Sequence, residues 1–163
     1  MAEATMTNGF HASSSPSKPA QLSFPMPHAP HVRINIHLSI LQHCILLFLA
    51  TSSVESGEGG CSMGSFVYAL PNRLSPSTPL STSLYGSSSS SAQMDFATRI
   101  AKIISKKTSK PTYVSNSISF ASTARGGAVE EEMDGLTRCV EVVLGEVEKA
   151  SRMSNAAKEL GEV

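Results

Sequence analysis

Histidine and cysteine are the residue types of this sequence that could bind a metal ion or act as a nucleophile. Three histidines, His31, His37 and His43, follow one another at intervals of six residues. On a strand, an even interval keeps side chains on one face, but six residues span about 20 Å, too far for one metal ion. We interpret the three histidines as solvated polar positions. The sequence predicts no metal site and no cofactor.

The three cysteines, Cys44, Cys61 and Cys139, are widely spaced, and no pair has the spacing of metal ligands. An odd number of dispersed cysteines is typical of reduced thiols, which favours a cytoplasmic protein, with the nucleus as a second location. Cys44 lies in the most apolar run of the chain, where a thiol usually serves as inert packing. The residues therefore favour a protein that is not an enzyme.

Two further segments have a chemical interpretation and a structural one. The glycine-rich segment "SGEGGCSMG" (56–64) could bind phosphate, but it lacks the G-K-[ST] ending and no helical period follows it. We interpret it as a hairpin loop. The basic residues from Arg99 to Lys110 could bind nucleic acid, but only Tyr113 is near enough to offer base stacking. A solvated helix face is the favoured interpretation.

Alternating and apolar runs predict the strands. "VRINIHLS" (32–39) has a period of two, which is typical of a half-buried strand. "HCILLFLAT" (43–51) is apolar on both faces, which predicts a central strand covered on both sides. The two runs are too close for a crossover helix, so we expect a hairpin or one long bent strand. The apolar run is also far shorter than the ~20 residues of a membrane helix. Further strands are expected in residues 63–71, 80–85 and 112–120.

Two segments have the period of amphipathic helices. In residues 92–107, Phe96, Ile100 and Ile104 fall on one stripe. Residues 128–150 repeat apolar side chains at steps of three and four, with acidic residues in the first turns, where the helix dipole favours them. The sequence thus predicts an α+β fold, with an antiparallel β-sheet of about five to six strands and two amphipathic helices.

Composition divides the chain into three parts. Residues 1–30 hold five of the nine prolines, show no apolar run of a secretory signal, and are expected to be a disordered tail. Residues 31–150 are expected to form one α+β domain, and residues 151–163 a frayed C-terminal tail. The five serines at 87–91 are interpreted as a flexible connection, without need of phosphorylation.

The net charge of zero is unevenly distributed. Residues 1–110 carry eight Lys and Arg against four Asp and Glu, whereas residues 111–163 carry five against nine. Nucleic-acid-binding proteins usually have a basic surplus, so the sequence favours neither a nucleic acid nor a membrane as partner. The dipolar layout is compatible with charge-steered association with a protein.

Three segments together resemble the proteasome assembly chaperone 4 family. They are "SFVYALPN" followed by "PLSTSLYG", the segment "TRIAKIISKKTSKPTYVSNSI", and the apolar strand pair before them. In that family a strand ends in P-[LV]-S-T-S-L-x-G, and a variable Ser/Thr-rich linker and a helix lead to a K-T-x-K-x-x-Y/F-V-S strand. The resemblance covers roughly residues 32–147; the tail, the longer serine linker and the extended acidic last helix depart from it. The matching residues are Pro79 to Leu84 with Gly86, and Lys107, Thr108, Lys110 and Tyr113 to Ser115.

The resemblance implies a non-enzymatic chaperone that forms a heterodimer with a proteasome assembly chaperone 3-like protein. Such a pair assists formation of the α-subunit ring of the 20S proteasome and contacts the α-subunits transiently. No binding residue carries over from the family. From the residues alone, we expect partner binding by side chains on two strands and on the last helix. These candidates are Leu80, Thr82, Leu84, Val114, Ile118, Val140 and Val143.

Two other classes of protein stay open at this point. A small α/β adaptor domain of membrane trafficking complexes has a similar mixture of sheet and helices. A hydrolase or nucleotide-binding enzyme would need a convergent polar cluster, which the sequence does not display. Co-purifying proteins distinguish the first alternative from an assembly chaperone, and nucleotide-dependent thermal stabilisation would support the second.

Overall fold

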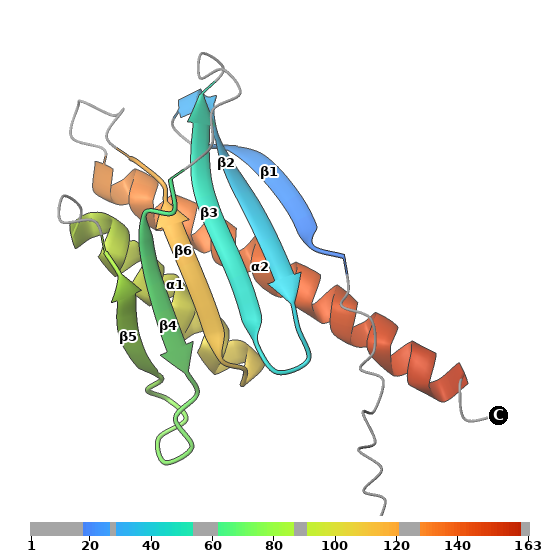
Figure 1. Ribbon diagram of the computed structural model, residues 1–163. Coiled ribbons are helices and arrows are strands. Elements are labelled where there is room, and N and C mark those ends of the chain that lie inside the picture. The colour runs from blue at the N-terminus through green and yellow to red at the C-terminus, as the bar shows by residue number, and fades with distance from the viewer. Residues whose placement is uncertain (1–17, 27–28, 54–61, 87–90, 121–127, 161–163) are drawn as a thin grey trace, which may run out of the picture.

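The computed structural model describes residues 18–26, 29–53, 62–86, 91–120 and 128–160, and for residues 53, 128 and 157–160 it describes the backbone alone (Figure 1). Within this part of the chain, strands and helices form one α+β arrangement, and the predicted fold class is confirmed. The elements are β1 (Ala20–Met26), β2 (Ala29–Ile40), β3 (Ile45–Ser53), β4 (Ser65–Leu70), β5 (Leu80–Tyr85), α1 (Ser91–Thr108), β6 (Thr112–Ser117) and α2 (Ala128–Leu160).

The six strands form one sheet in the order β1-β2-β3-β6-β4-β5. Strands β2 and β3 are a hairpin, as one of the two expectations had it. The expectation of an antiparallel sheet needs one correction, because β3 and β6 are parallel. Helix α1 returns the chain across the sheet, and β6 then enters between β3 and β4. Since β3 and β4 run in opposite directions, one of the two pairings of β6 has to be parallel.

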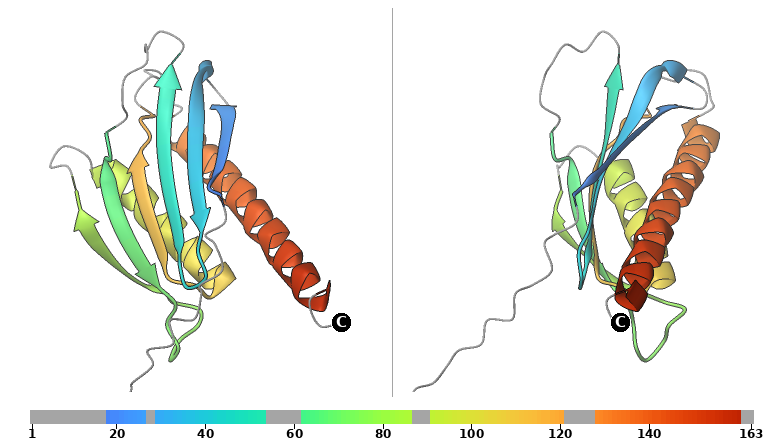
Figure 2. Two further views of the ribbon diagram at one scale, coloured as in Figure 1. Left: turned by 45° about the vertical axis from the view of Figure 1, so that its right-hand side comes forward. Right: turned by 90° about the vertical axis from the view of Figure 1, so that its right-hand side faces the viewer.

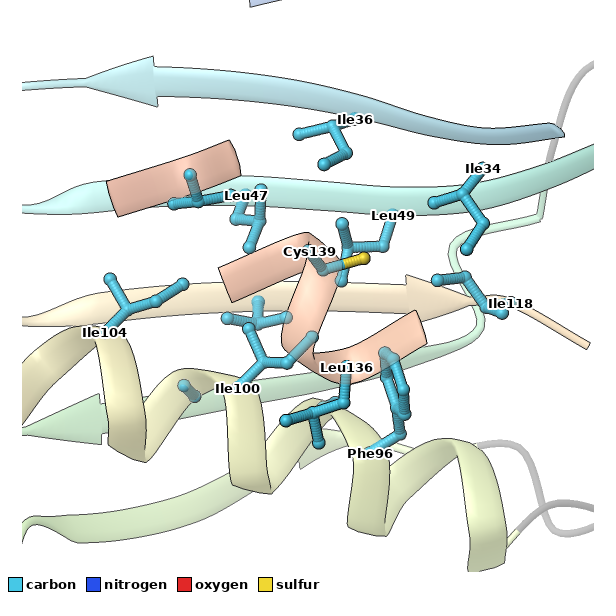
Figure 3. Packing of buried hydrophobic residues seen from close by; sticks show 14 of the residues in the cluster. Ile34, Ile36, Leu47, Leu49, Phe96, Ile100, Ile104, Ile118, Leu136 and Cys139 are labelled. Atoms are coloured by element: carbon cyan, nitrogen blue, oxygen red, sulfur yellow. The ribbon is translucent and has the colours of Figure 1, made fainter. Parts of the chain in front are cut away.

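Both helices lie on the same face of the sheet, as the edge-on view in Figure 2 shows. Alternate strand residues point toward them, among them Ile34 and Ile36 of β2 and Leu47 and Leu49 of β3. These side chains pack with the stripes of α1 and α2 in one core (Figure 3). Each large apolar side chain that is fully buried contributes roughly 1.5–3 kcal/mol, so the core accounts for the docking of both helices. The helix residues labelled in that core are Phe96, Ile100, Ile104, Leu136 and Cys139.

The junction between α1 and β6 is held by side-chain hydrogen bonds to the backbone. Thr108 Oγ1 donates to the carbonyl of Ile104 (2.8 Å) and accepts from the N–H of Lys110 (3.3 Å). Between them, Ser109 has a φ of 54°, the left-handed conformation that commonly ends a helix. At the far end of β6, the buried Asn116 Nδ2 donates to the carbonyl of Gln93 (3.0 Å). The K-T-x-K segment of the resemblance therefore ends one element and starts the next.

Strand β3 departs from its predicted environment. The apolar run on both of its faces predicts cover on both sides, but no helix of the described residues lies on the second face (Figure 2). Ile45, Leu47 and Leu49 are buried beneath the helices, whereas Leu46 and Phe48 are only half-buried on the opposite side. The strand is apolar on both faces, and the helices of the described residues cover one of them.

Both predicted tails are shorter in the structure than in the sequence-based division. Residues 20–26, assigned to a disordered tail by their composition, form β1, which pairs with β2. Its Leu22 and Phe24 pack against the core, and Pro25 is tolerated because β1 is an edge strand. At the other end, α2 continues to Leu160 instead of fraying after residue 150. The glycine-rich loop at 54–61, the serines at 87–90 and the loop at 121–127 lie outside the described residues.

Candidate partner interface

The face of the sheet that points away from both helices is the candidate partner interface, and we call it the open face. Its side chains alternate along each strand with those of the core, because successive residues of a strand point to opposite sides. It is half-apolar and half-polar, and its aromatic residues gather over the middle strands. The residues that form it include Gln21, Ser23 and Pro25 on β1; Arg33, Asn35, His37 and Ser39 on β2; Leu46, Phe48, Ala50 and Ser52 on β3; Tyr113, Ser115 and Ser117 on β6; Phe66, Tyr68 and Leu70 on β4; and Leu80, Thr82 and Tyr85 on β5.

Three aromatic rings form the centre of the open face. Tyr113 lies between two residues of the neighbouring strand, with its ring centroid 4.7 Å from that of Tyr68 and 6.2 Å from that of Phe66. Centroid separations in this range are those of favourable ring pairs. All three side chains are half-buried, so each still presents part of its ring to the outside. Phenylalanine and tyrosine with exposed ring surface are enriched in the centres of protein interfaces.

A second part of the open face is a shallow depression over β1, β2 and β3. Its volume is about 440 Å³, and His37 and Phe48 form one wall, with their rings in an edge-to-face contact at 6.0 Å. Beside it, Asn35 Nδ2 donates to Ser52 Oγ (2.8 Å). Apolar residues such as Phe48 and Ala50 line the depression together with the polar Gln21, Ser23 and Asn35, a mixture that suits a protruding side chain of a partner.

Strand β5 borders the open face and is an edge of the sheet. All its side chains are exposed, with Leu80 at 56% and Leu84 at 51%. It has β4 on one side and no strand of the described residues on the other, so one row of its backbone groups is free to pair. The strand carries no charged residue and no proline, the devices that usually protect an edge.

The residues proposed from the sequence as partner-binding fall into two groups. Leu80, Thr82 and Leu84 are exposed on β5, next to the aromatic centre of the open face. The other four lie on the opposite side of the sheet. Val114, Ile118 and Val143 are fully buried in the core, and Val140 is half-buried against it. In the folded chain the second group supports the sheet and the helices from inside.

The aromatic centre of the open face was absent from the sequence-based candidates. Phe66 and Tyr68 fall within the strand expected at residues 63–71, and Tyr113 was considered for base stacking and as a residue that matches the family, but none of the three was proposed to bind a partner. The sequence did indicate that these strands carry large side chains on both faces. If both predicted helices cover one face, the large side chains of the other face have no cover from helices and can meet a partner. The pattern does not state on which face both helices lie.

The described residues hold no assembled chemical site. No group of three His, Cys, Asp or Glu side chains among them is close enough to hold a metal ion. Burial raises the pKa of the Cys139 thiol from 9.0 to about 12, which keeps it protonated and unreactive. Residues 60–64, "GCSMG", match the G-x-S-x-G pattern of a nucleophile elbow. The exposed Ser62 leads into strand β4, however, whereas an elbow leads from a strand into a helix.

A solved structure shares the fold of this chain. A chain in a yeast structure described as "Crystal Structure of a Novel Chaperone Complex for Yeast 20S Proteasome Assembly" is similar with a TM-score of 0.58 and 17% sequence identity. The similarity covers 79% of this chain and 96% of the yeast chain. No curated protein matches the sequence. None of the described helices is both long and apolar enough to span a membrane.

The fold is thus that of a component of a proteasome assembly chaperone complex. The family model described as "Proteasome assembly chaperone 4" matches residues 33–118, more than half of the chain, and the chain belongs to that family. The matched residues run from within β2 to just past the end of β6, so they include most of β2, the whole of β3, β4, β5 and β6, and the whole of α1. The protein is a proteasome assembly chaperone.

Proposed function

We propose that this chain pairs with a proteasome assembly chaperone 3-like protein and that the pair promotes formation of the α-subunit ring of the 20S proteasome. The chain acts without catalysis and contacts α-subunits transiently. Its family supports the role in assembly, and its dispersed cysteines, of which Cys44 and Cys139 form no disulfide, support a location in the cytoplasm or nucleus.

The open face is the observation that supports the proposed pairing with a second chaperone. A sheet that has helices on one side only leaves the apolar half of its second side in contact with water. Covering such a surface is favourable by roughly 25 cal/mol per Å² of apolar area. A related chaperone with the same uncovered face would place its sheet against this one, since two sheets pack face to face about 10 Å apart. The aromatic centre around Tyr113 would then lie inside the interface.

The pairing is tested by co-expression of the full-length chain with its candidate partner, followed by size-exclusion chromatography. Phe48→Asp places a charge in the middle of the open face, where the partner would desolvate it, so we expect the heterodimer to be lost. Ser81→Asp is the matched control, because Ser81 is exposed and faces away from the open face. Loss of the heterodimer in both variants, or in neither, would contradict pairing through the open face.

The assembly role is tested by purifying the tagged chain from its own cells and identifying the accompanying proteins by mass spectrometry. We expect a second small chaperone together with proteasome α-subunits, and few subunits of the mature β-rings. Coat or tether proteins without proteasome subunits would favour an adaptor of membrane trafficking instead, which is the alternative that the fold alone leaves open.

A further inference from the structure

Three connections meet at one end of the sheet, where β2 and β4 end and β3, β5 and β6 begin (Figure 1). They are the β2–β3 turn (41–44), the β4–β5 loop (71–79) and the α1–β6 junction (106–111). These segments contain four Lys or Arg residues and not one Asp or Glu. We call their surface the basic end; it consists of Leu41, Arg73, Leu74, Lys106, Lys107 and Lys110.

The cations of the basic end have no acidic partner within the described residues. In this they differ from most of the other described cations, which form ion pairs. Arg99 forms an ion pair with Glu132 of α2. Three cations on α2 each pair with a glutamate of their own helix, at 2.6 to 3.7 Å. Arg73, Lys106, Lys107 and Lys110 form none of these ion pairs. Their positive charge is therefore uncompensated locally, although the whole chain is neutral.

The basic end is also preorganised. Lys110 Nζ donates to the carbonyl of Leu41 (3.3 Å), which fastens the α1–β6 junction to the β2–β3 turn. In the β4–β5 loop, Asn72 Oδ1 accepts hydrogen bonds from the N–H groups of Leu74 (3.0 Å) and Ser75 (3.2 Å). A surface that is already ordered loses little conformational entropy when it binds.

From these observations we propose that the basic end docks an acidic protein segment, and that it is the surface that meets the proteasome α-subunit. The identification of the α-subunit as the partner rests on the proposed function. The charge requires an acidic partner, and the partner also has to accept apolar side chains. Leu74 is 98% exposed beside Arg73, and Leu41 is 38% exposed beside the Lys110 ammonium group. Apolar groups set among cations fit an acidic segment with apolar residues in it.

Nucleic acid fits this surface less well. Single-stranded nucleic acids are held by aromatic rings that stack on the bases, together with cations. Segments 41–44, 71–79 and 106–111 contain no Phe, Tyr or Trp. The basic end is distinct from the open face, so one chain can hold its chaperone partner and its client at the same time.

The test uses the full-length chain co-expressed with its partner chaperone, and purified 20S α-subunits as probes. Lys106→Glu with Lys107→Glu should weaken capture of an α-subunit about tenfold, and raising the salt concentration should weaken wild-type capture. Arg73→Glu with Leu74→Asp should do the same and leaves helix α1 untouched. Lys149→Glu with Arg152→Glu is the matched control, since it changes the charge equally on the exposed side of α2.

The outcomes separate this proposal from the proposed function. Weakened capture in both basic-end variants, with an intact heterodimer and an unaffected control, supports docking at the basic end. Unchanged capture in both variants overturns it and leaves the assembly role standing. A wild-type heterodimer that captures no α-subunit overturns the assembly role itself. Variants that keep capture but lose binding to a 20-nucleotide RNA would assign the basic end to nucleic acid, which also overturns the proposal.

Discussion

At the scale of the residue, two glycines differ in whether their position tolerates a side chain. Gly64 precedes β4 with a φ of 64°, and a Cβ there would lie 2.0 Å from the carbonyl oxygen of Asn116. Gly145 is inside α2, and a Cβ there would meet nothing within 4 Å. The first position therefore requires glycine for its backbone and for its close approach to β6, and the second does not.

Alanine at these two positions should change stability in opposite directions. Gly145→Ala should raise the free energy of unfolding by roughly 0.5–1 kcal/mol, because alanine restricts the unfolded chain and favours the helix. Gly64→Ala should lower it by more than about 1 kcal/mol, because the backbone has to move to relieve the overlap. Urea unfolding of both variants measures the two effects. A Gly64→Ala protein as stable as the wild type would contradict the close approach to Asn116.

At the scale of the element, the two halves of α2 differ in packing: the first half packs against the core, and the second half has few contacts. Leu136, Cys139 and Val143 are buried against α1 and the sheet. From residue 151 to 156 every side chain is exposed, and Figure 1 shows this part of the helix extending past the edge of the sheet. The helix is thus docked by one stripe in its first half.

A charge in that stripe should undock the helix. Val143→Asp should lower the free energy of unfolding by about 3 kcal/mol or more, because an unpaired carboxylate would be buried in an apolar core. The same change at the half-buried Val140 should cost less. Val129→Asp is the control, since Val129 is 75% exposed in the first turn, where a negative charge is favourable. Thermal unfolding compares the three variants, and equal melting temperatures would show that the stripe is exposed in solution.

At the scale of the whole molecule, the two faces of the sheet differ in whether the described helices cover them. The helices cover the core side of the sheet, and no helix or strand of the described residues covers the open face or pairs with the outer side of β5 (Figure 2). An uncharged edge next to partly exposed aromatic residues is a surface on which copies of one chain associate.

The chain expressed alone should therefore self-associate, and its partner should suppress this. We expect light scattering to report a mass above that of the monomer, increasing with concentration. Phe48→Asp should return the chain to a monomer, because the charge makes burial of the open face unfavourable. Persistent self-association in that variant would locate the contact elsewhere, with the β5 edge as the first place to examine.

The elements of this protein could be predicted from the sequence because they depend on local patterns. The alternation of residues 32–39 and the stripe of Phe96, Ile100 and Ile104 gave a strand and a helix, since each pattern describes neighbours only a few residues apart. The run "LSTSLY" coincides with β5, and the family resemblance there is confirmed by the family match. Sequence composition was a poorer guide, because β1 contains proline and serine and gains its order from pairing with β2.

The tertiary structure alone decided which face of the sheet is covered. A strand pattern records that Leu46 and Phe48 are apolar, but their cover depends on where segments far along the chain return. Helices α1 and α2 return to the same face, so Val114 and Ile118 lie in the core, whereas Tyr113, the neighbour of Val114 along β6, lies half-buried on the open face. The basic end arises in the same way, since its cations come from segments more than 30 residues apart that only the order of the strands brings together.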